Sequence, residues 1–350
     1  MINNLESAFL RLILYVALLC VLIACDPLAP DSAPVVIVVT PTIAPTRTSL
    51  PALAPTAAPT QADLSSTTLQ AGTETGPEPA TVVPLTSTES ASAQGCTETQ
   101  GLVVDLQFSS KIAGTAIKYR AYLPPCYSQT TRRYPYVILM PGSDGDETLW
   151  TNTLKADVAE DRGLAVSALP PMILIMTAGG DLMNLNAFPD LPSWETVIVS
   201  ELIPDVEKNL CTWNAREGRA IGGISRGGFW AFEIAFRHPE LFGAVGGHSP
   251  FFDPQNSPPA VNPMSLAKTL QFAPGMQPRI WLDIGKDDAN RPNVEVFEKT
   301  LAGRNIDPGY TMNPVGDHSN QYWSGHVAEY LSFYGQTWPH DASELPSCLQ

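Results

Sequence analysis

A serine between closely spaced glycines is the first feature of this chain that could do chemistry. Gly223-Ile224-Ser225-Arg226-Gly227 has the pattern G-x-S-x-G and joins a strand-like stretch, "RAIGGI", to a helix-like stretch, "RGGFWAFEIAF". On a sharp turn from strand to helix, a serine has an unfavourable backbone geometry and its hydroxyl is accessible to a substrate. Side chains at Gly223 and Gly227 would collide with the neighbouring strand and helix. This context predicts that Ser225 is a nucleophile; the alternative is a small residue in a glycine-rich bend.

A serine hydroxyl is a weak nucleophile unless a base takes its proton, so a histidine must lie nearby. Of the five histidines, His318 in "VGDHSNQYW" is expected on a loop between the last strand and the last helix, and we predict that it is the base. The other four stand at a helix end, just after a strand, inside the last helix and in the tail: His238, His248, His326 and His340. His248 follows the serine too soon for the chain order serine, acid, histidine, and at most lines a pocket.

A carboxylate must orient the histidine, and "LDIGKDDAN" offers three. Asp283 is expected within a strand, where its side chain could turn toward solvent or a helix. Asp288 is expected in the loop after that strand, where it can reach the histidine, and Asp287 is the alternative. The order Ser225, Asp288, His318 is typical of one arrangement of the serine-histidine-acid triad.

Backbone N–H groups are suited to stabilise the oxyanion of a tetrahedral intermediate because they are fixed in advance. We expect one from Arg226, the residue after the nucleophile. The other is expected from Ser143, in the turn "PGSDG" that follows an apolar stretch. The composition of "PGSDG" fits a plain surface turn equally well.

The elements that must position these residues alternate along the chain. Two strand-like stretches at 101–110 and 116–124 precede a series of short apolar runs, "VILM", "MILIMTA", "RAIGGIS", "LFGAVGGHS" and "RIWLDIG", separated by helical patterns. Such alternation predicts a three-layer α/β/α sandwich with a mostly parallel central sheet. The candidate residues follow predicted strands, and the carboxyl ends of parallel strands are where such sheets bind ligands.

Several stretches together resemble the esterase D group of α/β-hydrolases, which includes feruloyl esterases, enterochelin esterases and, more distantly, mycolyltransferases. They are "YLPPCYSQTTRRYPYVILMPGSDGDETLW", "PPMILIMTAGG", "WETVIVSELIPDVEKNL", "RAIGGISRGGFWAFEIAFRHPELFGAVGGHSP" and "GDHSNQYW", in which Trp323 follows His318 by five residues. The resemblance covers about residues 116–335. It implies the α/β-hydrolase fold, a triad of Ser225, Asp288 and His318, and an oxyanion hole formed by the N–H groups of Ser143 and Arg226.

Three positions depart from the pattern of this group. Pro141 stands where the group has histidine before the oxyanion loop, and Asp144 replaces a glycine, so the shape of the hole or the accepted substrate could differ. Cys126 in "LPPCY" replaces a glycine, which fits a disulfide.

The N-terminal part predicts export. Residues 12–24 form an unbroken apolar run of the length found in signal peptides and short for a membrane span. The run ends in Leu22-Ile23-Ala24-Cys25, which resembles the bacterial lipobox, whereas Cys20 lacks a small residue before it. We therefore expect a lipoprotein signal peptide over 1–24, lipidation of Cys25 and attachment to the outer face of the cell membrane. The alternative is an uncleaved short anchor helix.

The remainder divides by composition. Residues 25–95 are rich in Pro, Thr, Ala and Ser and lack aromatic residues, which predicts a disordered linker. Residues 96–350 have the length of one domain.

Four cysteines fall in this domain. In an oxidising compartment they favour two disulfides, and we predict Cys96 with Cys348 and Cys126 with Cys211; free thiols are the alternative. Their spacing fits no CxxC zinc or redox motif.

The formal net charge of −15 and the absence of a basic run argue against nucleic acid as a partner. We expect no metal or organic cofactor. The predicted function is hydrolysis of carboxylic esters, small or linked to polysaccharides, through an acyl-enzyme. An acyltransferase with the same triad and a non-catalytic binding module on a hydrolase scaffold are the alternatives, and the sequence does not indicate the oligomeric state.

Overall fold

The computed structural model describes residues 96–188 and 191–349, and their elements alternate as the sequence predicts. The predicted signal segment, Cys25 and the predicted linker lie outside these residues. The strands are β1 (Leu102–Ser109), β2 (Ala116–Leu123), β3 (Tyr136–Met140), β4 (Ile173–Thr177), β5 (Arg219–Ile224), β6 (Ala244–His248), β7 (Arg279–Gly285) and β8 (Gly309–Asn313). The helices are α2 (Ala156–Ala165), α3 (Gly180–Asn184), α4 (Trp194–Val197), α5 (Ile203–Asn209), α6 (Arg226–Arg237), α7 (Pro263–Thr269), α8 (Arg291–Ala302) and α9 (Asn320–Gly335), with π-helical turns at Leu149–Thr153 and Ile198–Leu202.

The eight strands form one sheet in the order β1-β2-β4-β3-β5-β6-β7-β8. The pairs β1–β2 and β2–β4 are antiparallel, and every later neighbour is parallel. The parallel strands are short and apolar because helices cover both of their faces, as in β3 and β4, whose residues are all buried. The sheet thus brings the carboxyl ends of β3, β5, β6, β7 and β8 to one edge.

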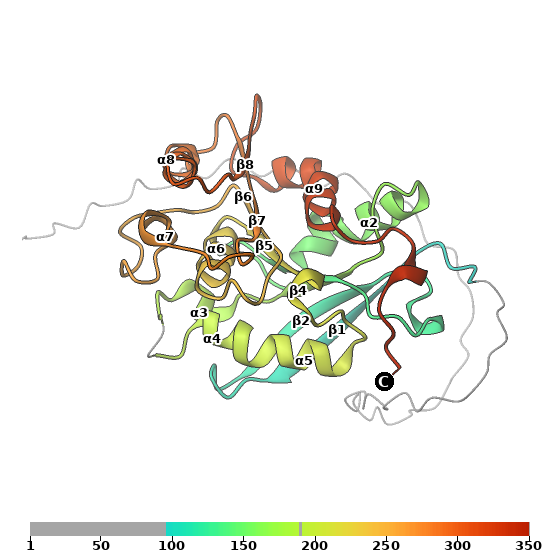
Figure 1. Ribbon diagram of the computed structural model, residues 1–350. Helices are drawn as coiled ribbons and strands as arrows, with labels where there is room; N and C mark the ends of the chain where they lie inside the picture. The colour runs from blue at the N-terminus through green and yellow to red at the C-terminus, as the bar shows by residue number, and fades with distance from the viewer. Residues whose placement is uncertain (1–95, 189–190, 350) are drawn as a thin grey trace, which may run out of the picture. The chain divides into compact units, whose positions relative to one another are not determined.

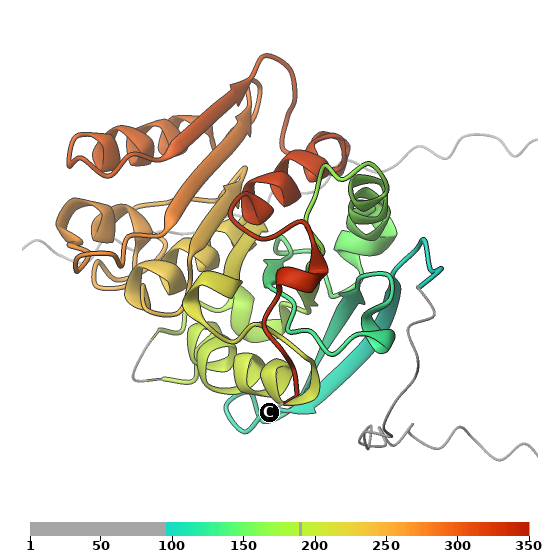
Figure 2. The same cartoon turned by 45° about the vertical axis from the view of Figure 1, so that its right-hand side comes forward.

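Alternate side chains of the strands point to two separate hydrophobic cores. On one face, Ile138 of β3 and Ile221 of β5 share a core with α4 to α8. On the other, Val137 and Leu139 of β3 share a core with α2 and α9. Figures 1 and 2 show α2 beside α9 on one side of the sheet and α5 on the other. This three-layer arrangement confirms the predicted α/β-hydrolase fold.

The predicted pairing of the cysteines is wrong. The disulfides join Cys96 to Cys126 and Cys211 to Cys348, with Cα–Cα distances of 5.7 and 5.8 Å. Because β1 and β2 form an antiparallel hairpin in which Leu102 faces Leu123, the residues before β1 and after β2 meet at the same end. Cys96 is therefore held near Cys126, with which it pairs.

The second disulfide follows from the path of the C-terminal tail. Cys348 N–H donates to the carbonyl of Thr131, and the Tyr134 N–H donates to the carbonyl of Cys211. The segment 131–134 thus runs between the tail and the end of α5, which places Cys348 beside Cys211. Both bridges lie at the edges of the domain, away from the strand ends that carry the predicted site.

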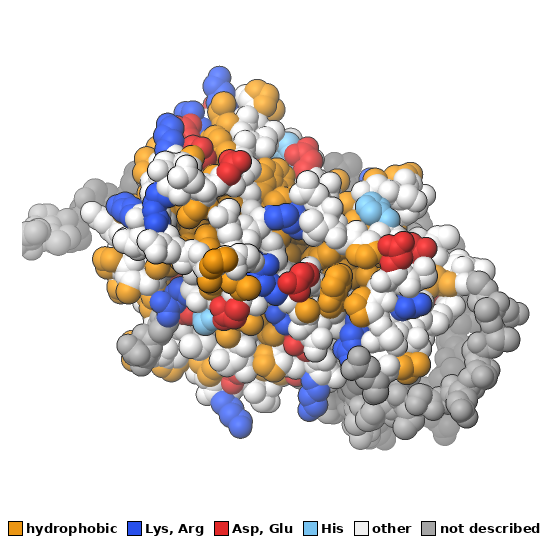
Figure 3. Space-filling view, viewed as in Figure 1, with side chains coloured by type: hydrophobic (Ala, Val, Ile, Leu, Met, Phe, Trp, Pro, Cys, Tyr) orange, Lys and Arg blue, Asp and Glu red, His pale blue; other side chains and the backbone are white. Residues whose placement is uncertain are grey.

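Among the described residues, no helix combines the length and hydropathy that crossing a bilayer requires. On the face shown in Figure 3, acidic and basic side chains are interspersed.

Candidate active site

Ser225 stands on the sharp turn between β5 and α6. Its backbone has φ 51° and ψ −117°, a conformation that side chains rarely adopt and that persists only where the surroundings enforce it. Two hydrogen bonds supply this restraint: the Ser225 N–H donates to the carbonyl of His248, at the end of β6, and the Ser225 carbonyl accepts from the N–H of Phe251. The turn therefore has the geometry of a nucleophile elbow.

The two elbow glycines are required for the reason the sequence suggests. A Cβ atom at Gly223 would lie 2.6 Å from the carbonyl carbon of Gly227, and one at Gly227 would lie 2.4 Å from the carbonyl oxygen of Met140. Backbone atoms cannot move aside as a flexible side chain can. Glycine at both positions thus lets α6 start directly against the ends of β3 and β5.

Ser225, His318 and Asp288 form one hydrogen-bonded series across three strand ends. Ser225 Oγ lies 2.9 Å from His318 Nε2, and His318 Nδ1 lies 2.9 Å from Asp288 Oδ2. Asp288 is buried, and its other oxygen accepts from the N–H of Asn290 at 2.8 Å. Because a carboxylate only accepts, the His318 proton sits on Nδ1 and Nε2 is free to accept from the serine hydroxyl. The arrangement can withdraw a proton from Ser225.

The alternative acid, Asp287, is exposed, although its N–H donates to the carbonyl of Gly316 in the histidine loop. The structure therefore brings Asp288, and not Asp287, to the imidazole. Trp323 packs edge-on against His318 with ring centroids 4.9 Å apart, so the first turn of α9 restrains the histidine ring from the side.

The two residues predicted to supply the oxyanion donors both lie close to the serine. A Cβ atom at Gly142 would be 3.4 Å from Ser225 Cβ, so the turn from Gly142 to Gly145, closed by a 3.0 Å hydrogen bond, lies against the nucleophile. Ser143 is the next residue of that turn. Arg226 opens α6, and an N–H in the first turn of a helix has no acceptor within the helix.

The other four histidines lie outside this series. His238 contacts Glu195 at 2.7 Å, His326 contacts Glu329 at 3.1 Å, and His340 is exposed. His248, at the end of β6, is fully buried.

His248 instead belongs to a second histidine–aspartate pair, which the sequence did not predict. Its Nδ1 lies 2.6 Å from Asp283 Oδ1, and its Nε2 lies 2.8 Å from the hydroxyl of Tyr334. Asp283 Oδ2 accepts from the hydroxyls of Tyr322 at 2.8 Å and Tyr330 at 3.2 Å. Burial, followed by the charge of Asp283, raises the pKa of both Tyr322 and Tyr330, so these phenols stay protonated donors.

This buried network ties α9 to the sheet directly beneath the site. All three tyrosines are on α9, which begins just after His318, and His248 holds the Ser225 N–H through its carbonyl. The feature of the sequence that could have indicated this network is the glycine pair Gly222 and Gly246, which face each other in β5 and β6. A Cβ at either would lie within 2.3 Å of the Tyr334 hydroxyl, so both glycines make room for that oxygen.

The side chain of Arg226 is a further feature of the site that motif spacing did not reveal. It is buried, and its Nε donates to the carbonyl of Met183, just before the end of α3, at 3.0 Å. Its Nη2 donates to Asn186 Oδ1, and its guanidinium lies over the ring of Phe229 at 4.8 Å from the centroid. Burial lowers the pKa of Arg226 to about 10, which still leaves the side chain charged at neutral pH.

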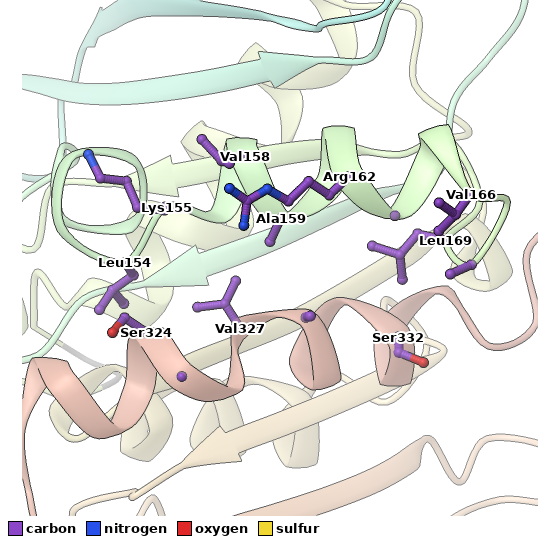
Figure 4. Close-up of a pocket in the computed structure, with 14 residues that line it drawn as sticks. Leu154, Lys155, Val158, Ala159, Arg162, Val166, Leu169, Ser324, Val327 and Ser332 are labelled. Carbon is purple, nitrogen blue, oxygen red and sulfur yellow. The ribbon is translucent and has the colours of Figure 1, made fainter.

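A groove of about 410 Å³ lies between α2 and α9, away from the serine (Figure 4). Its lining is mainly apolar, with Leu154, Leu169 and Val327, and its charged residues are Lys155 and Arg162. None of the three hydrogen-bonded residues lines it.

One group of possible metal ligands occurs within the described ranges, formed by Cys96, Glu98 and Cys126. Both sulfur atoms are consumed in the disulfide, so neither is available as a thiolate.

The strand order and the strained serine between β5 and α6 define an α/β-hydrolase fold with a nucleophile elbow. The model of a family described as "Putative esterase" matches residues 110–339, and the chain belongs to this family.

Curated relatives have similar descriptions. An endo-1,4-beta-xylanase/feruloyl esterase of Xylanibacter ruminicola is 32% identical over 155 residues, which cover 42% of this chain and 21% of the relative. An esterase of Mycobacterium tuberculosis is 29% identical over 147 residues, covering 41% of this chain and 31% of that protein. The chain thus spans less than a third of the length of these relatives.

Solved structures share the fold. A ferulic acid esterase superposes with a TM-score of 0.61 at 22% identity, covering 68% of this chain and 98% of the other. The S-formylglutathione hydrolase of Staphylococcus aureus superposes with a TM-score of 0.57 at 18% identity, covering 67% and 98%.

Proposed function

We propose that the chain hydrolyses carboxylic esters through an acyl-enzyme on Ser225. As His318 Nε2 takes the hydroxyl proton, Ser225 Oγ forms a bond to the ester carbonyl carbon. When the tetrahedral intermediate collapses, the bond from carbon to the alcohol oxygen breaks and His318 returns the proton to the leaving alcohol. Water then attacks the acyl-enzyme by the same route, which releases the carboxylic acid and restores the serine.

Asp288 and the two backbone donors have separate roles in this proposal. Asp288 keeps the His318 proton on Nδ1 and stabilises the imidazolium that forms during attack. The N–H groups of Ser143 and Arg226 stabilise the negative oxygen of each tetrahedral intermediate. Arg226 N–H also lies at the start of a twelve-residue helix, where the helix dipole favours negative charge.

One observation carries the proposal: a strained serine hydroxyl lies in hydrogen-bond reach of a histidine whose other nitrogen is held by a buried aspartate. A fluorophosphonate probe labels only an activated serine, so we expect it to label the native protein and not Ser225→Ala. Buried Ser249→Ala, which also alters a serine of positive φ but lies outside the series, is the matched control and should label normally. Labelling that persists in Ser225→Ala would contradict the proposal.

For the substrate, we propose an ester of an aromatic carboxylic acid as the first to test. Support comes from the printed descriptions of relatives as feruloyl and ferulic acid esterases. Release of ferulate from methyl ferulate, compared with release of acetate from an alkyl acetate, measures the preference. Adding an acceptor alcohol and looking for a new ester separates hydrolysis from acyl transfer.

We also propose that the domain acts outside the cytoplasm, held by a lipid on Cys25. The apolar run 12–24, which ends in Leu-Ile-Ala-Cys, supports this. Two disulfides support it as well, because they persist in oxidising compartments. In a bacterial host, the protein should incorporate a labelled fatty acid and sediment with membranes. Cys25→Ser should abolish both; unchanged incorporation would refute lipidation at Cys25.

A further inference from the structure

The segment that follows β4, which includes α3, is held against the start of α6 by the side chains of Arg226 and Trp230. The Met183 carbonyl accepts from Arg226 Nε at 3.0 Å and from Trp230 Nε1 at 2.8 Å. Arg226 also holds the side chain of Asn186, three residues further on. Because Arg226 and Trp230 occupy successive turns of one rigid helix, the loop around Met183 has little freedom to move.

The same loop reaches the turn that lies against the nucleophile. Asn184, the last residue of α3, donates from Nδ2 to the carbonyl of Ser143 at 3.0 Å. Asn184 and Ser143 are both exposed, so this hydrogen bond lies at the surface and not in the core. The turn from Gly142 to Gly145 is otherwise closed by a single internal hydrogen bond, and the Asn184 amide links it to a neighbouring element.

We propose that the Arg226 side chain is a positioning residue for the oxyanion hole, acting through Met183 and Asn186 on Asn184, which orients Ser143. In this arrangement Arg226 contributes to the oxyanion hole in two ways. The Arg226 N–H points from the helix start, and the Arg226 guanidinium secures the loop that holds the opposite donor. The inference rests on the proposed function, since it assigns the Ser143 N–H to the oxyanion.

The physical basis is the dependence of oxyanion stabilisation on donors that are fixed beforehand. A turn rich in glycine and small polar residues, such as "PGSDG", samples several backbone conformations unless a contact selects one. The guanidinium suits this task because its planar fork donates in two directions at once, to a carbonyl and to an amide oxygen. Lysine could not make both bonds with the same geometry.

Asn184→Ala tests the last of these contacts, the one from Asn184 to Ser143. We expect kcat to fall about 10-fold with KM nearly unchanged, because the lost contact loosens a donor used in the transition state. The inhibition constant of an aryl trifluoromethyl ketone, which forms a tetrahedral adduct with the serine, should rise by a similar factor. Asp181 is also exposed and also lies on α3. Asp181→Ala is therefore the matched control and should leave kcat and the inhibition constant as in the native protein.

Arg226→Ala tests the first link, since it removes the guanidinium and keeps the backbone N–H. We expect a fall in kcat at least as large as for Asn184→Ala, partly restored by added ethylguanidinium and not by ethylammonium at the same concentration. If Arg226→Ala does not fold, the exposed Asn184 variant decides.

The outcomes separate this inference from the proposed function. A native protein that hydrolyses esters, with Asn184→Ala and Arg226→Ala at native kcat and inhibitor affinity, overturns the inference and leaves the proposed function intact. Equal inactivity of the native protein and Ser225→Ala overturns the proposed function itself.

Discussion

The difference between Asp287 and Asp288 shows how much depends on one step along the chain. Both follow β7, and both are close to the histidine loop. Asp287 is exposed and contributes a backbone hydrogen bond, whereas Asp288 turns inward, accepts from Asn290 and reaches His318. Because the Asp288 carboxylate is buried, its hydrogen bond to the imidazole is stronger than a solvent-exposed one and orients the ring firmly.

Asp288→Asn should therefore lower kcat by about 10³- to 10⁴-fold, because an amide can donate to Nδ1 and so favour the wrong tautomer of His318. Asp287→Asn makes the same chemical change one residue earlier and should stay near native activity. Steady-state hydrolysis of an activated ester measures both. Equal losses in the two variants would show that Asp288 has no special relation to His318.

Sequence reasoning predicted the placement of Ser225, Asp288 and His318 because each depends on chain order and on the ends of strands. The elbow glycines were predictable for the same reason, since the turn admits no side chain there. Asn184 was not, because it sits at the end of a five-residue helix and makes its contact with a residue 41 positions away. Only the packing of loops at the sheet edge brings such a pair together.

At the scale of elements, helix α9 is joined to the sheet by a hydroxyl that occupies a gap between two strands. Tyr334 OH contacts His248 Nε2 and lies where side chains at Gly222 and Gly246 would be. The glycines in "IGGIS" thus have two different functions: Gly223 permits the elbow, and Gly222 admits the tyrosine. Motif reasoning explained only the first, because the need for the second arises on a helix more than 100 residues later.

A double-mutant cycle tests this fit. In Gly222→Ala the new Cβ would overlap the Tyr334 hydroxyl, and we expect a loss of about 1–3 kcal/mol in the free energy of unfolding. Tyr334→Phe removes the hydroxyl and leaves His248 Nε2 without its donor, at a cost of about 1–3 kcal/mol. The double variant should be less destabilised than the two single losses combined, by about 0.5–3 kcal/mol.

Denaturant unfolding of the four proteins provides these free energies. Gly325→Ala is the matched control, since a Cβ at this position of α9 meets nothing within 4 Å. It should raise the stability by about 0.5–1 kcal/mol through helix propensity alone. Strict additivity of Gly222→Ala and Tyr334→Phe would show that the hydroxyl and the glycine do not share the same space.

For the whole molecule, the fold was predictable, whereas only one of the two disulfides had a signal in the sequence. The alternation of short apolar runs with helical patterns predicts a layered parallel sheet, whatever the order of the strands within it. Pairing of cysteines depends on where loops and tails run. The hairpin of residues 101–124 did contain the signal for Cys96 and Cys126, since antiparallel strands bring their outer ends together, but the path of the tail beside residues 131–134 had no counterpart in the sequence pattern.

Peptide mapping without reduction should recover Cys96 linked to Cys126 and Cys211 linked to Cys348. The second bridge spans 137 residues and the first spans 30. Because a longer loop restricts the unfolded chain more, removing Cys211–Cys348 as a double alanine variant should cost about 1 kcal/mol more than removing Cys96–Cys126. Recovery of Cys96 linked to Cys348 would contradict the observed hairpin geometry.

The bridge between Cys96 and Cys126 also determines how the domain would bear a mechanical load. Strands β1 and β2 lie between these two cysteines, and β1 is the outermost strand of the sheet. Without the bridge, tension on the chain ahead of Cys96 would peel β1 away from β2 one hydrogen bond at a time. With the bridge, the tension passes from Cys96 to Cys126 through the sulfur atoms, so the hairpin carries none of it. A domain pulled from its N-terminal side would therefore yield first beyond residue 126, and reduction of this single bond would lower the force at which the edge of the sheet opens.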